Sequence, residues 1–227
     1  MSFRLDHIIR CVRDLDAGIA GAQGQGFNAF YGGVHAAGTT HNALICFADG
    51  SYDELMALTG RAAQPTAAMD FAWLLRDKSE GVVGWAIAAR DIDAEAAALR
   101  ARGVPVGAIT EGQRRRADGE VLRWRLAWID LRLPTILIQD VTPRRLRVPD
   151  DPAVTAQLNG TTGIAALILP PALEDAAHFA ALFGAPTQRP DGAHRYALEG
   201  SDLIVSPAAD APSVVYAGYS VTAAISS

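Results

Sequence analysis

Short hydrophobic runs alternate with turn residues along the chain, and one longer amphipathic stretch interrupts each set. The first set opens with LDHIIRCV, residues 5–12, and passes through a helical stretch that follows Asp14. It continues with the runs FNAFYGG, NALICFA and SYDELMAL. Runs of this length, bounded by glycine and aspartate, are typical of strands. The pattern therefore predicts a unit of one strand, one helix and three further strands.

The same unit recurs later in the chain. RDLDAGIAGAQGQGF begins at Arg13 and RDIDAEAAALRARGV begins at Arg90, an offset of 77 positions (90 − 13) that holds without a gap. Aspartate stands at the expected N-cap of each helix and glycine at its expected end. These residues are Asp14 and Gly26 in the first copy, and Asp91 and Gly103 in the second. The repeat predicts two equivalent modules, residues 1–60 and 80–145.

A weaker third copy follows a segment rich in proline and charge. GIAALILPPALEDAAHFAALFGA aligns with the first helix region at an offset of 158, and HRYALEG and SDLIVSPA are its later strands. The division predicted is a paired domain over residues 1–145, a linker over 146–159, and a third, partial module over 160–227 with a C-terminal strand. A short helix is also expected near residues 71–76, between the first two modules.

Composition narrows the classes of partner. Half of the residues are hydrophobic, which suffices for a sizeable core, and the net charge of −5 without a basic stripe argues against nucleic acid. Neither a signal peptide nor a stretch of about 20 apolar residues is apparent, so no membrane partner and a cytoplasmic location are expected. Cys11 and Cys46 lie in strand-like runs and are expected to be buried thiols.

The stretch GTTHNALICFADGSYDEL, residues 38–55, predicts a hairpin with polar ends. If Asp49-Gly50 is a two-residue turn, Ile45 lies opposite Glu54 and His41 shares the face of Glu54. His41 would then stand four residues, roughly 13 Å, beyond Ile45 along the strand. At that distance a shared ion is marginal, so contact with substrate and a purely structural role are left open for His41.

A second hairpin, EGQRRRADGEVLRWRLAWI, alternates arginine with large apolar residues and is expected to turn at Asp118-Gly119. Arg123 and Arg125 share one face, and Trp124 lies on the other. If the arginine face looks into a binding site, Arg123 or Arg125, assisted by Arg114 or Arg116, would hold a carboxylate or phosphate. The alternative is a solvated face paired with nearby glutamates.

The tandem repeat, with LDH in the first strand and YDEL in the fourth, resembles the vicinal-oxygen-chelate superfamily, and within it the glyoxalase-like domains. The resemblance covers residues 3–145 well and 160–207 loosely. It implies an α+β fold in which tandem βαβββ modules form a curved, cup-shaped mixed sheet with helices on the convex side. The third, partial module is additional to this arrangement.

In that superfamily a divalent metal usually lies in the cup, held by a first-strand residue and a fourth-strand carboxylate of each module. By position, the resemblance assigns His7 and Glu54 as catalytic residues and as an incomplete metal-ligand set. Module two offers Gly84, which has no side chain, and Gln139. Two outcomes are therefore left open: a bound Zn, Mn, Fe, Ni or Co ion, or no metal.

The resemblance favours an enzyme of the lyase, isomerase or dioxygenase type that acts on a small oxygenated molecule in the cup. The alternative is a metal-independent protein that sequesters small molecules, as bleomycin-binding members do. The third module, if unpaired, would favour a homodimer. The residues expected to contact the small molecule are His35, His41, Trp85, Arg123, Arg125 and Gln139.

Overall fold

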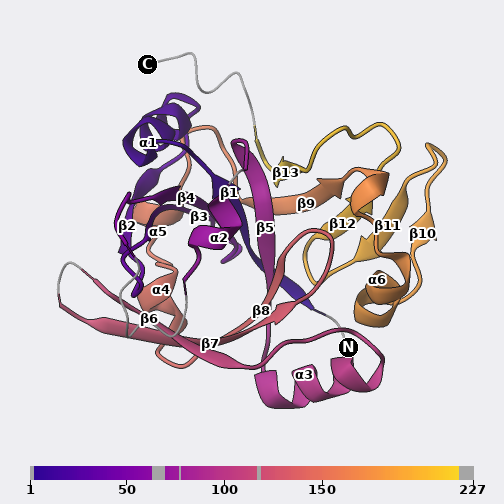
Figure 1. Ribbon diagram of the computed structural model, residues 1–227. Coiled ribbons are helices and arrows are strands. Elements are labelled where there is room, and N and C mark those ends of the chain that lie inside the picture. Colours follow the sequence, from indigo (N-terminus) through magenta and orange to yellow (C-terminus); the bar gives the residue numbers. More distant parts are fainter. Residues whose placement is uncertain (1–2, 63–69, 77, 117–118, 220–227) are drawn as a thin grey trace.

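Eight strands form a strongly curved sheet, sheet A, in the computed structural model of the chain, which describes residues 3–62, 70–76, 78–116 and 119–219 (Figure 1). Their order across the sheet is β2-β3-β4-β1-β5-β8-β7-β6. The bounds are β1 Arg4–Cys11, β2 Ala29–Val34, β3 Thr40–Cys46, β4 Tyr52–Leu58, β5 Gly81–Ala88, β6 Thr110–Arg115, β7 Val121–Ile129 and β8 Thr135–Asp140.

The two halves of sheet A confirm the predicted repeat. β1 pairs with β4 in parallel, β5 pairs with β8 in parallel, and β1 and β5 join the halves antiparallel. The helices are α1 (Leu15–Gly24) and α3 (Ile92–Ala101). At the start of each, an aspartate, Asp14 or Asp91, accepts one hydrogen bond from the backbone N–H three residues later, which is the expected N-cap contact. Both are followed by a glycine with positive φ.

A second sheet, sheet B, repeats this topology once more. Its order is β10-β11-β12-β9-β13, with β9 Gly163–Leu169, β10 Thr187–Gln188, β11 His194–Ala197, β12 Asp202–Val205 and β13 Ser213–Ala217. β13 pairs antiparallel with β9, as β5 does with β1. The predicted third module is thus present, and the C-terminal strand occupies the place of the first strand of a fourth module.

The third module packs against the convex face of sheet A. One hydrophobic core contains residues of both sheets, and Trp85, which is 0% exposed, meets Phe183 at the end of α6 (Ala176–Phe183), with ring centroids 5.8 Å apart. Fully burying one large apolar side chain stabilises a protein by roughly 1.5–3 kcal/mol, so this contact holds the two sheets together. The homodimer expected from an unpaired third module stays a prediction.

Short helices fill the connections. They are α2 Ala72–Leu75, within the segment predicted to be helical, α4 Arg144–Arg147, α5 Pro152–Thr155 and the 3-10 turn Pro171–Leu173. α4 and α5 lie in and beside the segment expected to be a linker, where Val148 packs against Leu44 and Tyr52 of sheet A. Cys11 and Cys46 are buried free thiols, as expected. None of the helices in the described ranges is long and apolar enough to cross a membrane.

Candidate functional site

The β3–β4 hairpin differs by one residue from the predicted register. Phe47 N donates to Ser51 O, so three residues, Ala48 to Gly50, form the loop instead of two. Gly50 adopts φ +80°, the left-handed conformation that a three-residue hairpin loop requires. Leu44 therefore lies opposite Glu54, and Thr40 opposite Leu58. The predicted pairing of Ile45 with Glu54 is wrong.

This shift exchanges the faces of the β3 side chains, because side chains alternate along a strand. Asn42, not His41, lies on the face of Glu54, and Asn42 Nδ2 donates to Glu54 Oε1 at 2.5 Å. His41 lies on the other face, next to Tyr31, with ring centroids 6.2 Å apart. The predicted shared face of His41 and Glu54 is therefore wrong, and His41 lies outside the site.

Two imidazoles approach opposite oxygen atoms of Glu54. His7 Nε2 lies 3.5 Å from Oε2, and His35 Nε2 lies 3.5 Å from Oε1. A hydrogen bond on the other side of each ring fixes its orientation. His7 Nδ1 lies 2.7 Å from Asp6 Oδ1, and His35 Nδ1 lies 2.8 Å from Thr40 Oγ1. The structure thus joins His7, Glu54 and His35, three of the predicted residues, in one buried cluster.

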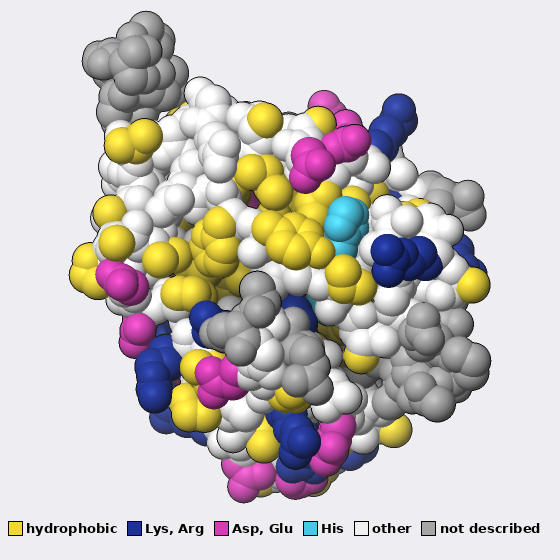
Figure 2. Space-filling view, turned by 90° about the vertical axis from the view of Figure 1, so that its left-hand side faces the viewer, with side chains coloured by type: hydrophobic (Ala, Val, Ile, Leu, Met, Phe, Trp, Pro, Cys, Tyr) yellow, Lys and Arg dark blue, Asp and Glu magenta, His cyan; other side chains and the backbone are white. Residues whose placement is uncertain are grey.

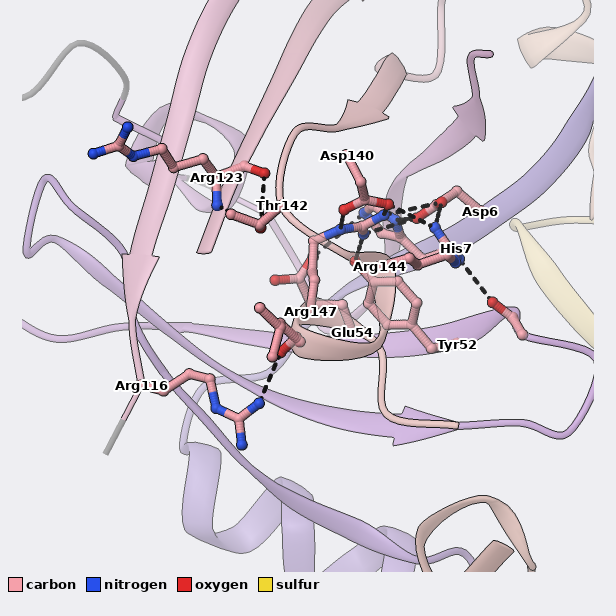
Figure 3. Close-up of polar contacts among 12 residues, drawn as sticks. Asp6, His7, Tyr52, Glu54, Arg116, Arg123, Asp140, Thr142, Arg144 and Arg147 are labelled. Atoms are coloured by element: carbon pink, nitrogen blue, oxygen red, sulfur yellow. Dashed lines mark hydrogen bonds and ion pairs between the residues drawn. The ribbon is translucent and has the colours of Figure 1, made fainter. Parts of the chain in front are cut away.

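Behind His7 lies a network of charges in which each group has an opposite partner (Figure 3). Arg147 contacts Asp6 through Nη1 and Nη2, at 2.9 and 3.1 Å, and Asp140 through Nε and Nη2, at 2.5 and 2.8 Å. Arg144 also donates to Asp6, and Arg147 Nη1 donates to the hydroxyl of Tyr52 at 2.8 Å. The Tyr52 ring stacks on His7 with a centroid distance of 4.4 Å. The network therefore positions the His7 ring.

Both carboxylates of the site are ionised. Burial would raise the pKa of Asp6, but Arg147, the hydrogen bond from His7 and the charge of Arg144 hold it well below its usual range. Burial likewise opposes ionisation of Glu54, yet hydrogen bonds from His35 and Asn42 and the charges of both histidines lower its pKa to about 2. Since an ionised carboxylate only accepts hydrogen bonds, the proton between His7 and Asp6 is on Nδ1.

The cluster lines a cavity of about 40 Å³ on the concave side of sheet A. Its walls are mainly apolar, with Trp124 and Leu126 from β7 and Ile136 and Ile138 from β8. Phe71, just before α2, covers His35, with ring centroids 5.0 Å apart. The polar groups Arg114 and Arg147 complete the lining. A mainly apolar lining with a few polar groups that point into the same space is typical of small-molecule sites.

The arginine face of β7 lies outside this cavity. Arg125 pairs with Asp93 of α3 through two hydrogen bonds of 2.6 and 2.9 Å, and Arg123 is exposed and points away from the charge network (Figure 3). The apolar face of β7, with Trp124, faces the cup instead. Of the two arrangements open from the sequence, the charged strand directed away from the cup is the one present.

Trp85 and Gln139 also lie away from the cavity. Trp85 faces the third module, and Gln139 is held at the start of α3, where its Nε2 donates to Arg90 O at 2.8 Å and its Oε1 accepts from Ile92 N at 3.2 Å. Strand pairing shows why the prediction that Gln139 is equivalent to Glu54 is wrong. Ile9 pairs with Glu54, and its repeat equivalent Ala86 pairs with Ile136. Ile136, not Gln139, thus occupies the position related to Glu54.

The residues present do not fit the metal site that the resemblance implies. The second module offers Gly84 and Ile136 at the equivalent positions, and neither side chain can coordinate an ion. His7 and His35 each approach a different oxygen of Glu54, which Asn42 also engages. Within the described part of the chain, no three His, Cys, Asp or Glu side chains are arranged to hold one metal.

Asp6, Asn42 and Arg147 are among the residues of the site that were not assigned a role from the sequence. Asp6 belongs to the LDH stretch, and its neighbour His7 was a candidate, so an orienting carboxylate was detectable there. Asn42 was hidden by the loop length, and Arg147 by its place in the predicted linker. Nothing in the local sequence RRLR, residues 144–147, indicates that Arg147 is buried against β1.

Comparisons with known proteins agree with this architecture. A family model described as glyoxalase-like domain matches residues 5–182. A crystal structure of a hypothetical protein from Staphylococcus aureus superposes with a TM-score of 0.73 at 18% identity, covering 90% of this chain and 86% of that one, which shows the fold. Methylmalonyl-CoA epimerase from Mycobacterium tuberculosis superposes less well, with a TM-score of 0.45 at 22% identity over 60% of this chain and 87% of its own. No curated protein sequence matches.

Proposed function

Because the chain belongs to the glyoxalase-like domain family, a branch of the vicinal-oxygen-chelate superfamily, we propose that it is an enzyme that transfers protons on a small oxygenated substrate in the cavity of its first two modules. Glu54 carries the proposal. Glu54 is 5% exposed, and its carboxylate lines the cavity and lies between two imidazole Nε2 atoms. A buried carboxylate and imidazoles that reach the same small volume are suited to general acid–base chemistry.

In this mechanism Glu54 takes a proton from the substrate, and the Nε2 atoms of His7 and His35 flank its two oxygen atoms at 3.5 Å. A carboxylate whose pKa is about 2 is a weak base, but burial by itself raises the pKa of Glu54. Hydrogen bonds from His35 and Asn42 keep the pKa of Glu54 low. A substrate that engages those donors releases Glu54 from them, so its pKa rises toward the range that a base needs. No step of this mechanism passes through a metal ion, because the side chains around Glu54 do not fit a metal site.

Solvent deuterium exchange tests this proposal. Small 2-oxo and 2-hydroxy acids and ketones in D₂O are followed by proton NMR, and the wild type is expected to label the carbon next to the carbonyl group. Glu54→Gln is expected to slow exchange by about 100-fold or more, the usual contribution of a positioned base. His41→Gln, on the other face of β3, should leave the rate unchanged. Equal rates in the wild type and Glu54→Gln would refute the role of Glu54.

A second candidate function is ligand sequestration without chemistry. Gly84 and Ile136 favour it, because at the positions that correspond to His7 and Glu54 the described part of the second module has no acid or base side chain. A ligand from the same panel that raises the thermal midpoint without added metal, and without exchange or turnover, would favour sequestration over catalysis.

A further inference from the structure

Arg114 of β6 is a buried cation that has no carboxylate partner within the part of the chain that the structure describes. The residue is 6% exposed, Nη1 donates to Asn42 Oδ1 at 3.0 Å, and Nε has no hydrogen-bond partner among the described residues. Arg147, the other arginine of the cavity, is neutralised by Asp6 and Asp140. A buried donor on a charged group is costly to leave unpaired.

The carboxylate of Glu54 does not remove this cost. Asn42 stands between Arg114 and Glu54, since its oxygen accepts from Arg114 and its amide nitrogen donates to Glu54. Glu54 favours the charged form of Arg114, but burial outweighs it and the pKa of Arg114 is lowered. The guanidinium of Arg114 can therefore still pair with an anion.

Arg114 also lies at the junction of two spaces. Leu44, Arg114 and Arg147 line the inner cavity and also an outer groove of about 710 Å³ beside β2. The groove has apolar walls, formed in part by Phe30, Tyr31, Leu146 and Pro149, and no carboxylate lines it among the described residues. Figure 2 shows this face of the molecule, where hydrophobic side chains gather and charged side chains of both signs lie around them.

The two volumes restrict the shape of a ligand. The inner cavity of about 40 Å³ holds only a few atoms, whereas complete small-molecule sites measure roughly 300–1,000 Å³. A ligand that reaches Glu54 therefore places its small reacting end inside and its remaining atoms in the groove. At the junction it passes the unpaired guanidinium of Arg114.

We propose that Arg114 binds the carboxylate of an organic acid whose apolar body lies in the groove over Phe30, Tyr31 and Leu146. A planar guanidinium matches a carboxylate through paired N–H donors, and the groove offers apolar surface but no competing negative charge. The inference deepens the proposed function by naming its substrate class, and it rests on the same cavity. Binding alone tests it, so it does not depend on turnover.

Calorimetric titration of the full chain with hexanoate, octanoate and octanol provides the test. The wild type is expected to bind octanoate about tenfold or more tightly than octanol, because a hydrogen-bonded charge is lost in the alcohol. Octanoate should also bind more tightly than hexanoate, by roughly fourfold for each added methylene. Octyl phosphate binding more tightly than octanoate, or octanol binding equally well, would overturn the proposal.

Variants separate binding from folding. Arg114→Gln is expected to abolish the preference for octanoate over octanol, whereas Arg123→Gln, which removes one exposed charge from the neighbouring strand, should retain it. Arg114→Gln should also melt at the same temperature as the wild type or higher, since an unpaired buried charge is removed. A lower midpoint together with an intact preference would show that Arg114 serves the fold only. Glu54→Gln should lose exchange but keep octanoate binding, so the two proposals can fail separately.

Discussion

Asp6 connects the charge network to the proposed catalytic cluster. Asp6 is 0% exposed, and its carboxylate accepts hydrogen bonds from His7 Nδ1, Arg144 and Arg147. One carboxylate thereby orients the His7 ring and partly neutralises two cations. A group with both duties affects stability and ring geometry together, which makes Asp6 the residue whose loss is expected to be most damaging to the site.

Asp6→Asn is expected to destabilise the protein by about 3–5 kcal/mol, because it leaves the buried Arg147 with a single anionic partner. Urea unfolding followed by fluorescence measures the change. Asp93→Asn is the matched control, since it breaks the exposed ion pair with Arg125 and should have no measurable effect. Similar losses in both variants would show that the Asp6 network carries no special stability.

The lowered pKa values of Asp6 and Glu54 predict acid sensitivity. A carboxylate whose pKa is depressed in the folded state stabilises the protein fully above its unfolded pKa, and this contribution is lost as pH falls toward the folded pKa. For Glu54 that window runs from about 4.5 down to about 2, and the contribution is roughly 3 kcal/mol.

Urea unfolding between pH 7 and pH 2.5 measures this dependence. Wild-type stability is expected to fall steeply below about pH 4.5, whereas Glu54→Gln should be less stable at neutral pH and show a shallower fall. Glu111→Gln, at an exposed position of β6, should follow the wild-type curve. A Glu54→Gln curve parallel to the wild type would contradict the lowered pKa.

At the scale of single elements, the repeat and the alternation of side chains were predictable. The aspartate N-caps, the glycine ends of α1 and α3, and the apolar and arginine faces of β7 all follow from spacing. The faces of β3 were not predictable, because ADG fits a two-residue or a three-residue loop equally well. One additional loop residue decided whether His41 or Asn42 lay beside Glu54.

β2 provides the space for the Arg114–Asn42 contact. A Cβ atom at Gly32 would lie 2.4 Å from Asn42 Oδ1 and 2.7 Å from Arg114 Nη1. Gly32→Ala is therefore expected to displace both side chains and to weaken octanoate binding by about tenfold, the effect of losing a charged hydrogen bond. Titration calorimetry measures it.

Gly21→Ala is the control for this substitution. A Cβ at Gly21 of α1 meets nothing within 4 Å, so the variant should bind octanoate normally and gain up to about 1 kcal/mol of stability from helix propensity. Normal octanoate binding by Gly32→Ala would show that the contact between Arg114 and Asn42 is dispensable for the site.

At the scale of the whole molecule, the three-module arrangement followed from the repeat, but the relation between modules did not. The sequence pattern does not show that residues 146–159 pack on sheet A, nor that Trp85 faces the third module instead of the cup. Both depend on contacts between distant segments, such as Arg147 with Asp6 and Trp85 with Phe183. Such contacts leave no periodic trace in either segment.

A polar contact also joins the third module to the first. Tyr216 of β13 donates to Asp53 Oδ2, and Arg10 contacts both, through Nε to Asp53 at 2.7 Å and Nη2 to Tyr216 at 2.9 Å. Asp53 is fully buried, so its carboxylate depends on these two donors. Tyr216→Phe removes one donor and leaves the ring in place.

Tyr216→Phe is expected to destabilise the whole chain by about 1–3 kcal/mol in a single unfolding transition. The reason is that the buried carboxylate of Asp53 loses one of its hydrogen-bond donors. Tyr219→Phe, at a partly exposed ring stacked on Phe27, is the control and should remain within about 0.5 kcal/mol of the wild type. Two separate transitions in Tyr216→Phe would mean that the modules unfold independently. A single, shifted transition would mean that the third module is an integral support of the convex face, and hence of the strand β4 that holds Glu54 in the cavity.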